Sequence, residues 1–127
     1  MSFTRLIFLS AALVNMLVAG LFFVFPGPMY ESMVAGAAPE TAAGVMYLFG
    51  TAVAVFGLGY YWVSRDFQKN RPLAVLAVYG KIGVFCVAAI AALTGAISLS
   101  GLSGTLIDLI YGFLFAYTLR ENPPAAP

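Results

Sequence analysis

Lys81 and Asp108 are the residues whose chemistry stands out in this sequence, because each lies inside a long apolar run. A charged side chain at the centre of a bilayer costs about 2.5–3.5 kcal/mol on insertion scales, so such residues usually face a partner or a cavity. Two residues of opposite charge, in the last two apolar runs, therefore predict a buried ion pair. Asn15 in the first run and Tyr111, about one turn after Asp108, are expected at a similar depth.

Two interpretations of this polar cluster, defined as Asn15, Lys81, Asp108 and Tyr111, carry the most weight and stay open. Polar side chains commonly hold membrane helices together, and the cluster would then fix the helix register. Alternatively, it is the floor of a pocket that binds a lipid head group, a quinone or a proton. The residues that we expect to line such a pocket are Gly57, Tyr60 and Tyr79. A third interpretation is that the cluster packs against another protein.

The residue types argue against a metal site and identify no catalytic residue. The chain has no His, which removes the commonest metal ligand and the commonest acid–base group at neutral pH. Its single cysteine, Cys86, can form no intrachain disulfide. Met29 and Met33 alone are thin support for a soft-metal site. We therefore expect no metal and favour a function other than catalysis.

The composition indicates an integral membrane protein. Of the 127 residues, 62% are hydrophobic and only 9% are charged, against about 25% charged in soluble domains. Four apolar runs predict spans at about 4–25, 41–63, 72–97 and 102–119, each near the roughly 20 residues that a spanning helix needs. The first run is long for a signal peptide, so we expect a retained helix. Residues 1–122 then form one domain, and 123–127 form a short disordered tail.

The charged residues outside the cluster predict the orientation. All the basic residues expected outside the spans fall on one side of the predicted membrane, and these are Arg5, Arg65, Lys69, Arg71 and Arg120. The segment 26–40 on the other side carries only acids, and its residues 29–34 could form a short interfacial helix. The positive-inside rule then places both termini in the cytoplasm, which predicts a multi-pass protein of the bacterial inner membrane. Short connections favour an all-α, up-down-up-down four-helix transmembrane bundle.

Small residues predict which helix faces meet, because close packing replaces the hydrophobic drive inside a bilayer. In the second run Ala43, Gly50, Gly57 and Ser64 recur every seven residues. In the other three runs the small residues share a face with Asn15, Lys81 or Asp108. This arrangement predicts that all three polar side chains point into the bundle.

Several short motifs carry a resemblance to a known group of proteins. They are Asn15 with Gly20, Phe56–Tyr61, Arg65-Asp66, Asn70–Leu73, Tyr79–Lys81, Asp108–Tyr111 and Phe113–Phe115. In these the chain resembles small, uncharacterised four-helix bacterial membrane proteins akin to the DoxX-like group. The resemblance implies that Asn15, Lys81 and Asp108 belong to a shared pattern. Some DoxX-like proteins are linked to quinone-coupled thiosulfate oxidation, but no redox residue of this chain can be matched to that activity.

The function that we expect is that of a small, non-enzymatic membrane protein. It binds a lipid-like or quinone-like molecule, or it serves as an accessory subunit. The alternatives are a quinone-linked redox helper of DoxX-like type and a small proton-coupled carrier. The expected partners are membrane lipid and either a larger membrane complex or further copies of the chain. A net charge of +1 gives no argument for nucleic acid.

Overall fold

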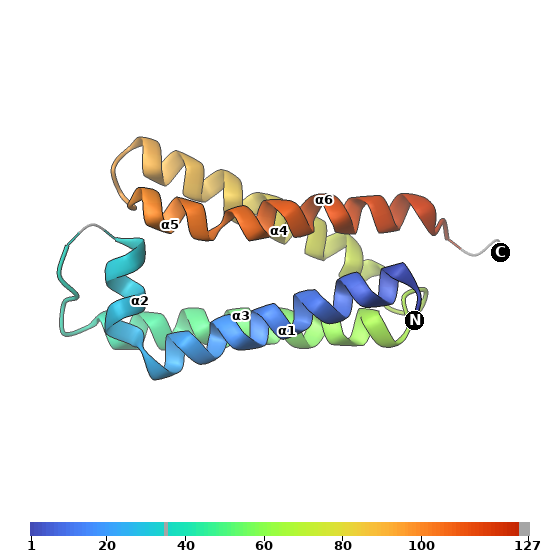
Figure 1. Cartoon of the computed structure of the whole chain (residues 1–127), viewed down its shortest axis with the longest axis horizontal. Helices are drawn as coiled ribbons and strands as arrows, with labels where there is room; N and C mark the ends of the chain where they lie inside the picture. The colour runs from blue at the N-terminus through green and yellow to red at the C-terminus, as the bar shows by residue number, and fades with distance from the viewer. Residues whose placement is uncertain (35, 125–127) are drawn as a thin grey trace.

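The computed structural model describes residues 1–34 and 36–124, and this part of the chain is helical without strands. The helices are α1 Phe3–Val24, α2 Pro26–Met33, α3 Ala42–Arg65, α4 Arg71–Leu93, α5 Leu99–Gly104 and α6 Leu106–Glu121 (Figure 1). The fold is the all-α bundle that the sequence predicts. Of the expected tail, residues 125–127 lie outside the described part.

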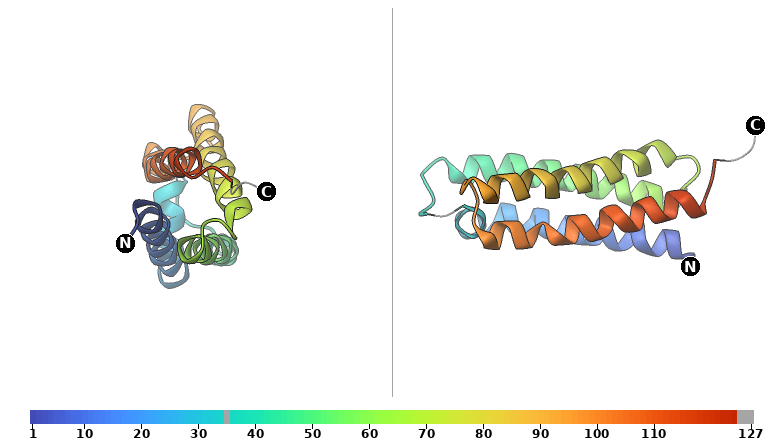
Figure 2. Two further views of the ribbon diagram at one scale, coloured as in Figure 1. Left: turned by 90° about the vertical axis from the view of Figure 1, so that its right-hand side faces the viewer. Right: turned by 90° about the horizontal axis from the view of Figure 1, so that it is seen from above.

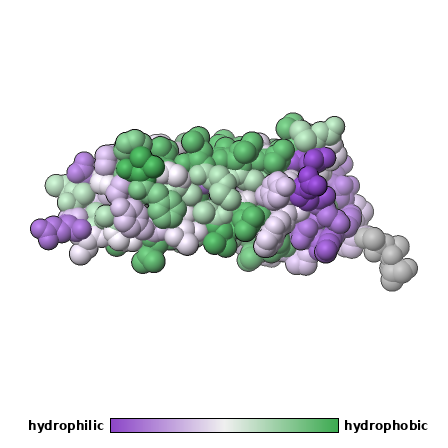
Figure 3. All heavy atoms as spheres, turned by 90° about the horizontal axis from the view of Figure 1, so that it is seen from below, coloured by the Kyte–Doolittle hydropathy of each residue, from purple (hydrophilic) through white to green (hydrophobic). Residues whose placement is uncertain are grey.

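Within that part, four stretches are long and apolar enough to cross a membrane: α1, α3, α4 and the combined segment Leu99–Glu121. Their outer surfaces expose large apolar side chains such as Leu13, Leu48 and Val87. Figure 3 shows apolar residues along the length of the bundle and hydrophilic residues gathered at its ends. The chain is a small multi-pass membrane protein, because such a surface is stable in lipid and not in water.

The helices form two antiparallel hairpins, α1 with α3 and α4 with α6 (Figures 1 and 2). In the first hairpin, α1 and α3 approach each other closely at two glycines of α3. A Cβ atom at Gly50 would lie 3.0 Å from the Phe22 Cβ, and one at Gly57 would lie 3.1 Å from the Asn15 Cβ. Between the hairpins, contacts are less extensive. The predicted small-residue seam of the second span therefore holds α1 against α3.

The main core between the hairpins occupies one half of the bundle. This half lies toward the end that carries the N-terminus, the 66–70 loop and Asn122, which we call the terminal end. There Phe8 of α1 stacks on Phe115 of α6, with ring centroids 4.3 Å apart and planes 4° from parallel. The Asn122 side-chain amide, just after α6, donates to Thr4 Oγ1 of α1 at 3.1 Å. Within the second hairpin, Arg71 of α4 donates hydrogen bonds to the Leu119 and Asn122 carbonyls at the end of α6. The hairpins are therefore joined at the terminal end.

At the opposite end, α2 crosses between the two hairpins (Figure 1). Pro26 begins this helix, since a proline suits the first helical turn. Ser98 then holds its last turn: the Ser98 backbone N–H donates to the Met33 carbonyl at 2.8 Å, and the Ser98 hydroxyl donates to the Ser32 carbonyl at 2.8 Å. The predicted interfacial helix thus exists, but it begins at Pro26 and folds inward against α5. We call this end the α2 end.

Two helix ends differ from the predicted spans. The third span was expected to continue to residue 97, but α4 ends at Leu93 because Gly95 adopts a φ of 75°. The Gly95 and Ala96 N–H groups donate back to Ala92 and Ala91, which closes the helix in a Schellman turn. The fourth span begins at Leu99 rather than 102, because the Ser98 hydroxyl caps α5 by accepting from the Gly101 N–H.

Candidate functional site

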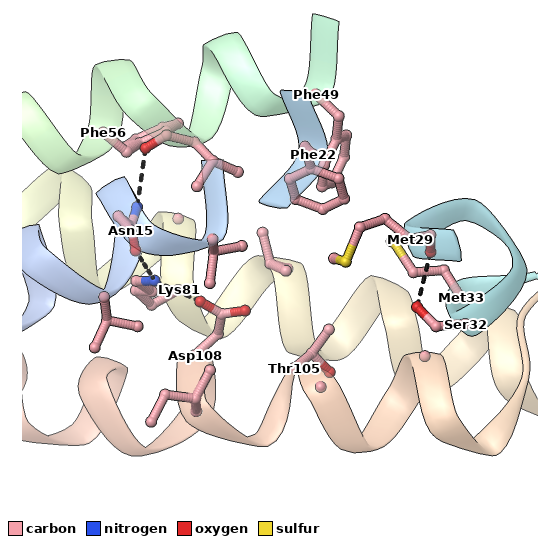
Figure 4. Close-up of a pocket in the computed structure, with 18 of the residues that line it drawn as sticks. Asn15, Phe22, Met29, Ser32, Met33, Phe49, Phe56, Lys81, Thr105 and Asp108 are labelled. Atoms are coloured by element: carbon pink, nitrogen blue, oxygen red, sulfur yellow. Dashed lines mark hydrogen bonds and ion pairs between the residues drawn. The ribbon is translucent and has the colours of Figure 1, made fainter. Parts of the chain in front are cut away.

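Lys81 of α4 forms the centre of the polar cluster and joins both hairpins. Its Nζ lies 2.5 Å from Asp108 Oδ1 on α6, and it donates to Asn15 Oδ1 on α1 at 3.0 Å. The Asn15 amide Nδ2 in turn donates to the Val53 carbonyl of α3 at 3.1 Å. Figure 4 shows this chain of bonds running across the bundle. The predicted ion pair is therefore present, and four helices contribute to its network.

The ammonium group is closely surrounded. The Lys81 side chain is 8% exposed, whereas that of Asp108 is 19% exposed. The Lys81 Nζ also lies 5.4 Å from the Tyr60 ring centre and 5.9 Å from that of Tyr111. These distances suit cation–π attraction, which is favourable within about 6 Å of a ring centre. The lysine charge is thus balanced by one carboxylate, one amide oxygen and two aromatic faces.

The local sequence explains how Lys81 and Asp108 are brought together. Lys81 shares a buried face of α4 with Ala74, Ala77 and Ala88, so no bulky side chain keeps α6 away. Asp108 follows the interruption between α5 and α6 at Thr105. The Thr105 hydroxyl donates back to the Leu102 carbonyl at 2.8 Å, a bond that often bends a helix. Asp108 consequently lies in the first turn of a new helix.

A cavity of about 310 Å³ extends from the cluster toward the α2 end. Its walls come from α1, α3, α4, α5 and α6, and α2 contributes at the end of the bundle (Figure 4). Most lining side chains are apolar. The described lining is Val14, Asn15, Val18, Phe22, Met29, Ser32, Met33, Phe49, Val53, Phe56, Tyr60, Gly80, Lys81, Val84, Ser100, Gly101, Gly104, Thr105, Ile107 and Asp108. The site is therefore an apolar chamber whose floor is an ion pair.

The structure brings most of the predicted residues to this region. Asn15, Lys81 and Asp108 are bonded to one another, and Tyr60 lines the cavity. Tyr111 is adjacent through its ring, but its hydroxyl donates to Ser10 Oγ at 3.1 Å rather than to the ion pair.

Two of the expected lining residues lie elsewhere. Tyr79 is 73% exposed on the outside of α4, because it precedes Lys81 by two residues and so lies about 200° away around the helix axis. Gly57 is buried, and a Cβ atom there would lie within 3.4 Å of Asn15, Met16 and Ala12. It allows α1 and α3 to approach, and it is not part of the cavity wall.

Met29, Ser32 and Met33 of α2 also line the cavity, and the sequence did not predict this role. The sequence feature that could have indicated this role is the expected short helix, in which the apolar residues Met29 and Met33 are four positions apart and share one face. This feature did not show that the helix turns into the bundle. That placement depends on Ser98 and on Gly101, where a Cβ atom would lie 2.6 Å from the Met33 carbonyl oxygen.

The chemistry of the cavity suits a neutral, mostly apolar molecule. Its floor carries one positive and one negative side chain in direct contact, so their charges cancel. Comparison with protein-family models, with curated proteins and with solved structures found no match.

Proposed function

We propose that this protein is a non-enzymatic membrane protein that binds a lipid-like or quinone-like molecule in the cavity between its hairpins. The observation that carries the proposal is the apolar chamber of about 310 Å³ ending at the partly exposed carboxylate of Asp108. Small-molecule sites are typically chambers of about 300–1,000 Å³, mainly apolar, with a few polar groups that orient the ligand. A purely structural clasp needs no such chamber beside it.

Access from the bilayer supports a lipid-soluble ligand. On the α3 and α4 side, Phe49, Phe56 and Val84 line the cavity and are also exposed on the surface. On the α6 side, Ile107 has both properties. Apolar residues that border both the cavity and the lipid allow a molecule to enter sideways without crossing a polar barrier.

The setting that we propose is the bacterial inner membrane, with the terminal end in the cytoplasm. The basic side chains Arg65, Lys69 and Arg71 lie around the loop at that end, and Glu31 and Glu40 lie near the other. This distribution supports the orientation through the positive-inside rule. The cavity then opens in the outer half of the membrane.

The relationship to the DoxX-like group stays a proposal, supported by the convergence of Asn15, Lys81 and Asp108. A role as an accessory subunit is compatible with the same binding site. The quinone-linked redox helper and the proton-coupled carrier remain alternatives. A bound coloured cofactor would favour the former, and proton flux in proteoliposomes would favour the latter.

The test is to identify what co-purifies with the protein when the cavity is open or filled. Val18→Phe places a larger side chain in the lining, and Leu17→Phe introduces the same residue type on the exposed neighbouring face of α1. We expect lipid mass spectrometry of mildly solubilised protein to find one species enriched over bulk lipid. Enrichment should persist in Leu17→Phe and fall in Val18→Phe. Equal enrichment in both variants, or none in the native protein, would contradict the proposal.

A further inference from the structure

The two charged groups at the floor of the cavity differ in how much hydrogen-bonding capacity they have left for a ligand. Lys81 has three N–H bonds, and it directs two of them at Asn15 and Asp108 while two aromatic rings lie over its Nζ. Its remaining hydrogen therefore lies among aromatic faces. The Asn15 amide donates to the Val53 carbonyl. The ammonium and the amide thus each keep one unused N–H bond, and both residues are buried.

Asp108 is different, because only one of its carboxylate oxygens is used. Among the described residues, its side chain accepts a hydrogen bond through Oδ1 alone. No buried side-chain oxygen in the described part lacks a partner, so Oδ2 is accessible from the cavity. Figure 4 shows one oxygen turned toward Lys81 and the other away from it, on the side of Thr105. An ionised carboxylate oxygen is an acceptor only.

We propose that the ligand is a neutral, lipid-soluble alcohol whose hydroxyl donates a hydrogen bond to Asp108 Oδ2. This inference rests on the proposed function and specifies the ligand's polar end. The ligand is neutral because Lys81 already balances the carboxylate. The polar end is a donor because a free carboxylate oxygen repels groups that carry only acceptors. A carbonyl-only head group, such as that of an oxidised quinone, is thus disfavoured at this position.

Tyr60 indicates that the donor group of the ligand is a hydroxyl. It lines the cavity, and no hydrogen bond joins its hydroxyl to another described residue, so the hydroxyl is accessible. A hydroxyl ligand can donate to Asp108 and also accept from a phenol, because a hydroxyl group has both capacities. An ammonium ligand would donate as well, but it would add a second positive charge beside Lys81.

The experiment compares a donor with a matched compound that cannot donate. The probes are a long-chain alkanol carrying a photoreactive diazirine in its chain, and the methyl ether of the same compound. Each is added at the same mole fraction to the native protein in lipid nanodiscs, irradiated, and mapped by peptide mass spectrometry. We expect the alcohol to label the cavity lining at least about tenfold more than the ether, as for one hydrogen bond to a charged acceptor.

Two variants assign the preference to Asp108. Either probe can accept a hydrogen bond from the Tyr60 phenol. In Tyr60→Phe we therefore expect labelling by both probes to fall by the same factor, so the ratio of alcohol to ether labelling stays high. In the double variant Lys81→Met with Asp108→Leu the floor has lost its charged acceptor and keeps only the neutral Asn15 amide, so the ratio should fall well below its native value. A ratio that collapses in Tyr60→Phe would overturn the assignment to Asp108.

Failure of this inference is distinguishable from failure of the proposed function. Equal labelling of the lining by both probes in the native protein, abolished by Val18→Phe, would leave the binding site standing and refute the donor requirement. Labelling of outer residues alone, unchanged by Val18→Phe, would refute the binding site itself. The comparison of the two probes uses the native protein, so it does not depend on any variant folding.

Discussion

Lys81 and Asp108 show how a bilayer changes the consequence of a single substitution. Lys81 is buried and Asp108 is partly buried, and each has the other as its direct ionic partner. Removing one leaves the other with its full desolvation cost, whereas removing both leaves an apolar contact. Asn15 adds a second acceptor for the ammonium at 3.0 Å, so some of the lysine interaction survives the loss of the carboxylate.

A double-mutant cycle tests this pair. Lys81→Met alone and Asp108→Leu alone should each destabilise the protein by about 3 kcal/mol. The double variant should recover a large part of that loss, as measured by thermal unfolding in detergent. Lys69→Met, which removes an exposed positive charge in the 66–70 loop, serves as the control and should leave the melting temperature nearly unchanged. Strictly additive losses would mean that the two side chains do not interact.

At the scale of elements, contacts at both ends and the polar cluster between them join the two hairpins. Ser98 and Gly101 attach α2 to α5 at one end, and Phe8 stacks on Phe115 at the other. Within the second hairpin, Arg71 attaches α4 to the end of α6. The attachments by Ser98 and Arg71 involve backbone carbonyls at helix ends, which otherwise lack partners inside a bilayer. The cavity lies between them, so its shape depends on how α2 is held.

The attachment of α2 predicts opposite effects for two glycines of α5. In Gly101→Ala the new Cβ would lie 2.6 Å from the Met33 carbonyl oxygen, so α2 must move. We expect a loss of about 1–3 kcal/mol, the usual cost of overpacking. Gly104→Ala meets nothing within 4 Å and should be neutral or stabilising by up to about 1 kcal/mol. Thermal unfolding of the two variants side by side measures the difference, and equal effects would contradict this packing.

The attachment at the terminal end predicts a specific role for one of two nearby arginines. Arg71→Ala removes hydrogen bonds to the Leu119 and Asn122 carbonyls, and we expect a loss of about 1–2 kcal/mol. Arg65→Ala removes an exposed arginine of the same region and should change stability by less than about 0.5 kcal/mol. Chemical denaturation in mixed micelles can compare them. Equal losses of stability in the two variants would show that positive charge in this region, rather than the Arg71 bonding, matters.

At the scale of the whole molecule, the bundle has two chemically different halves. The terminal half is filled by the aromatic core around Phe8 and Phe115. The other half contains the cavity, which α2 borders at the end of the bundle. The polar cluster lies at the boundary between these halves. The packed core beyond the ion pair therefore limits the depth of the cavity.

The orientation of the whole molecule is tested by thiol labelling in intact cells. The background is Cys86→Ala, since Cys86 is exposed. Ser2→Cys and Gln68→Cys should react only with reagents that reach the cytoplasm, because the basic residues lie at that end. Ala37→Cys, placed in the connection between α2 and α3, should react from outside. Labelling of position 68 by an impermeant reagent would reverse the orientation.

The sequence alone determined the spans, the meeting of opposite charges and the expected orientation. Apolar length sets the spans. The cost of burying charge predicts that Lys81 and Asp108 meet, and the structure confirms this. Helical spacing from Lys81 already places Tyr79 on the outer face of α4. Only the tertiary structure decided that α4 ends at Leu93 and that α2 turns inward to border a cavity. A cavity is the space left between several helices, so its existence depends on their mutual distances, and no pattern within one helix records those distances.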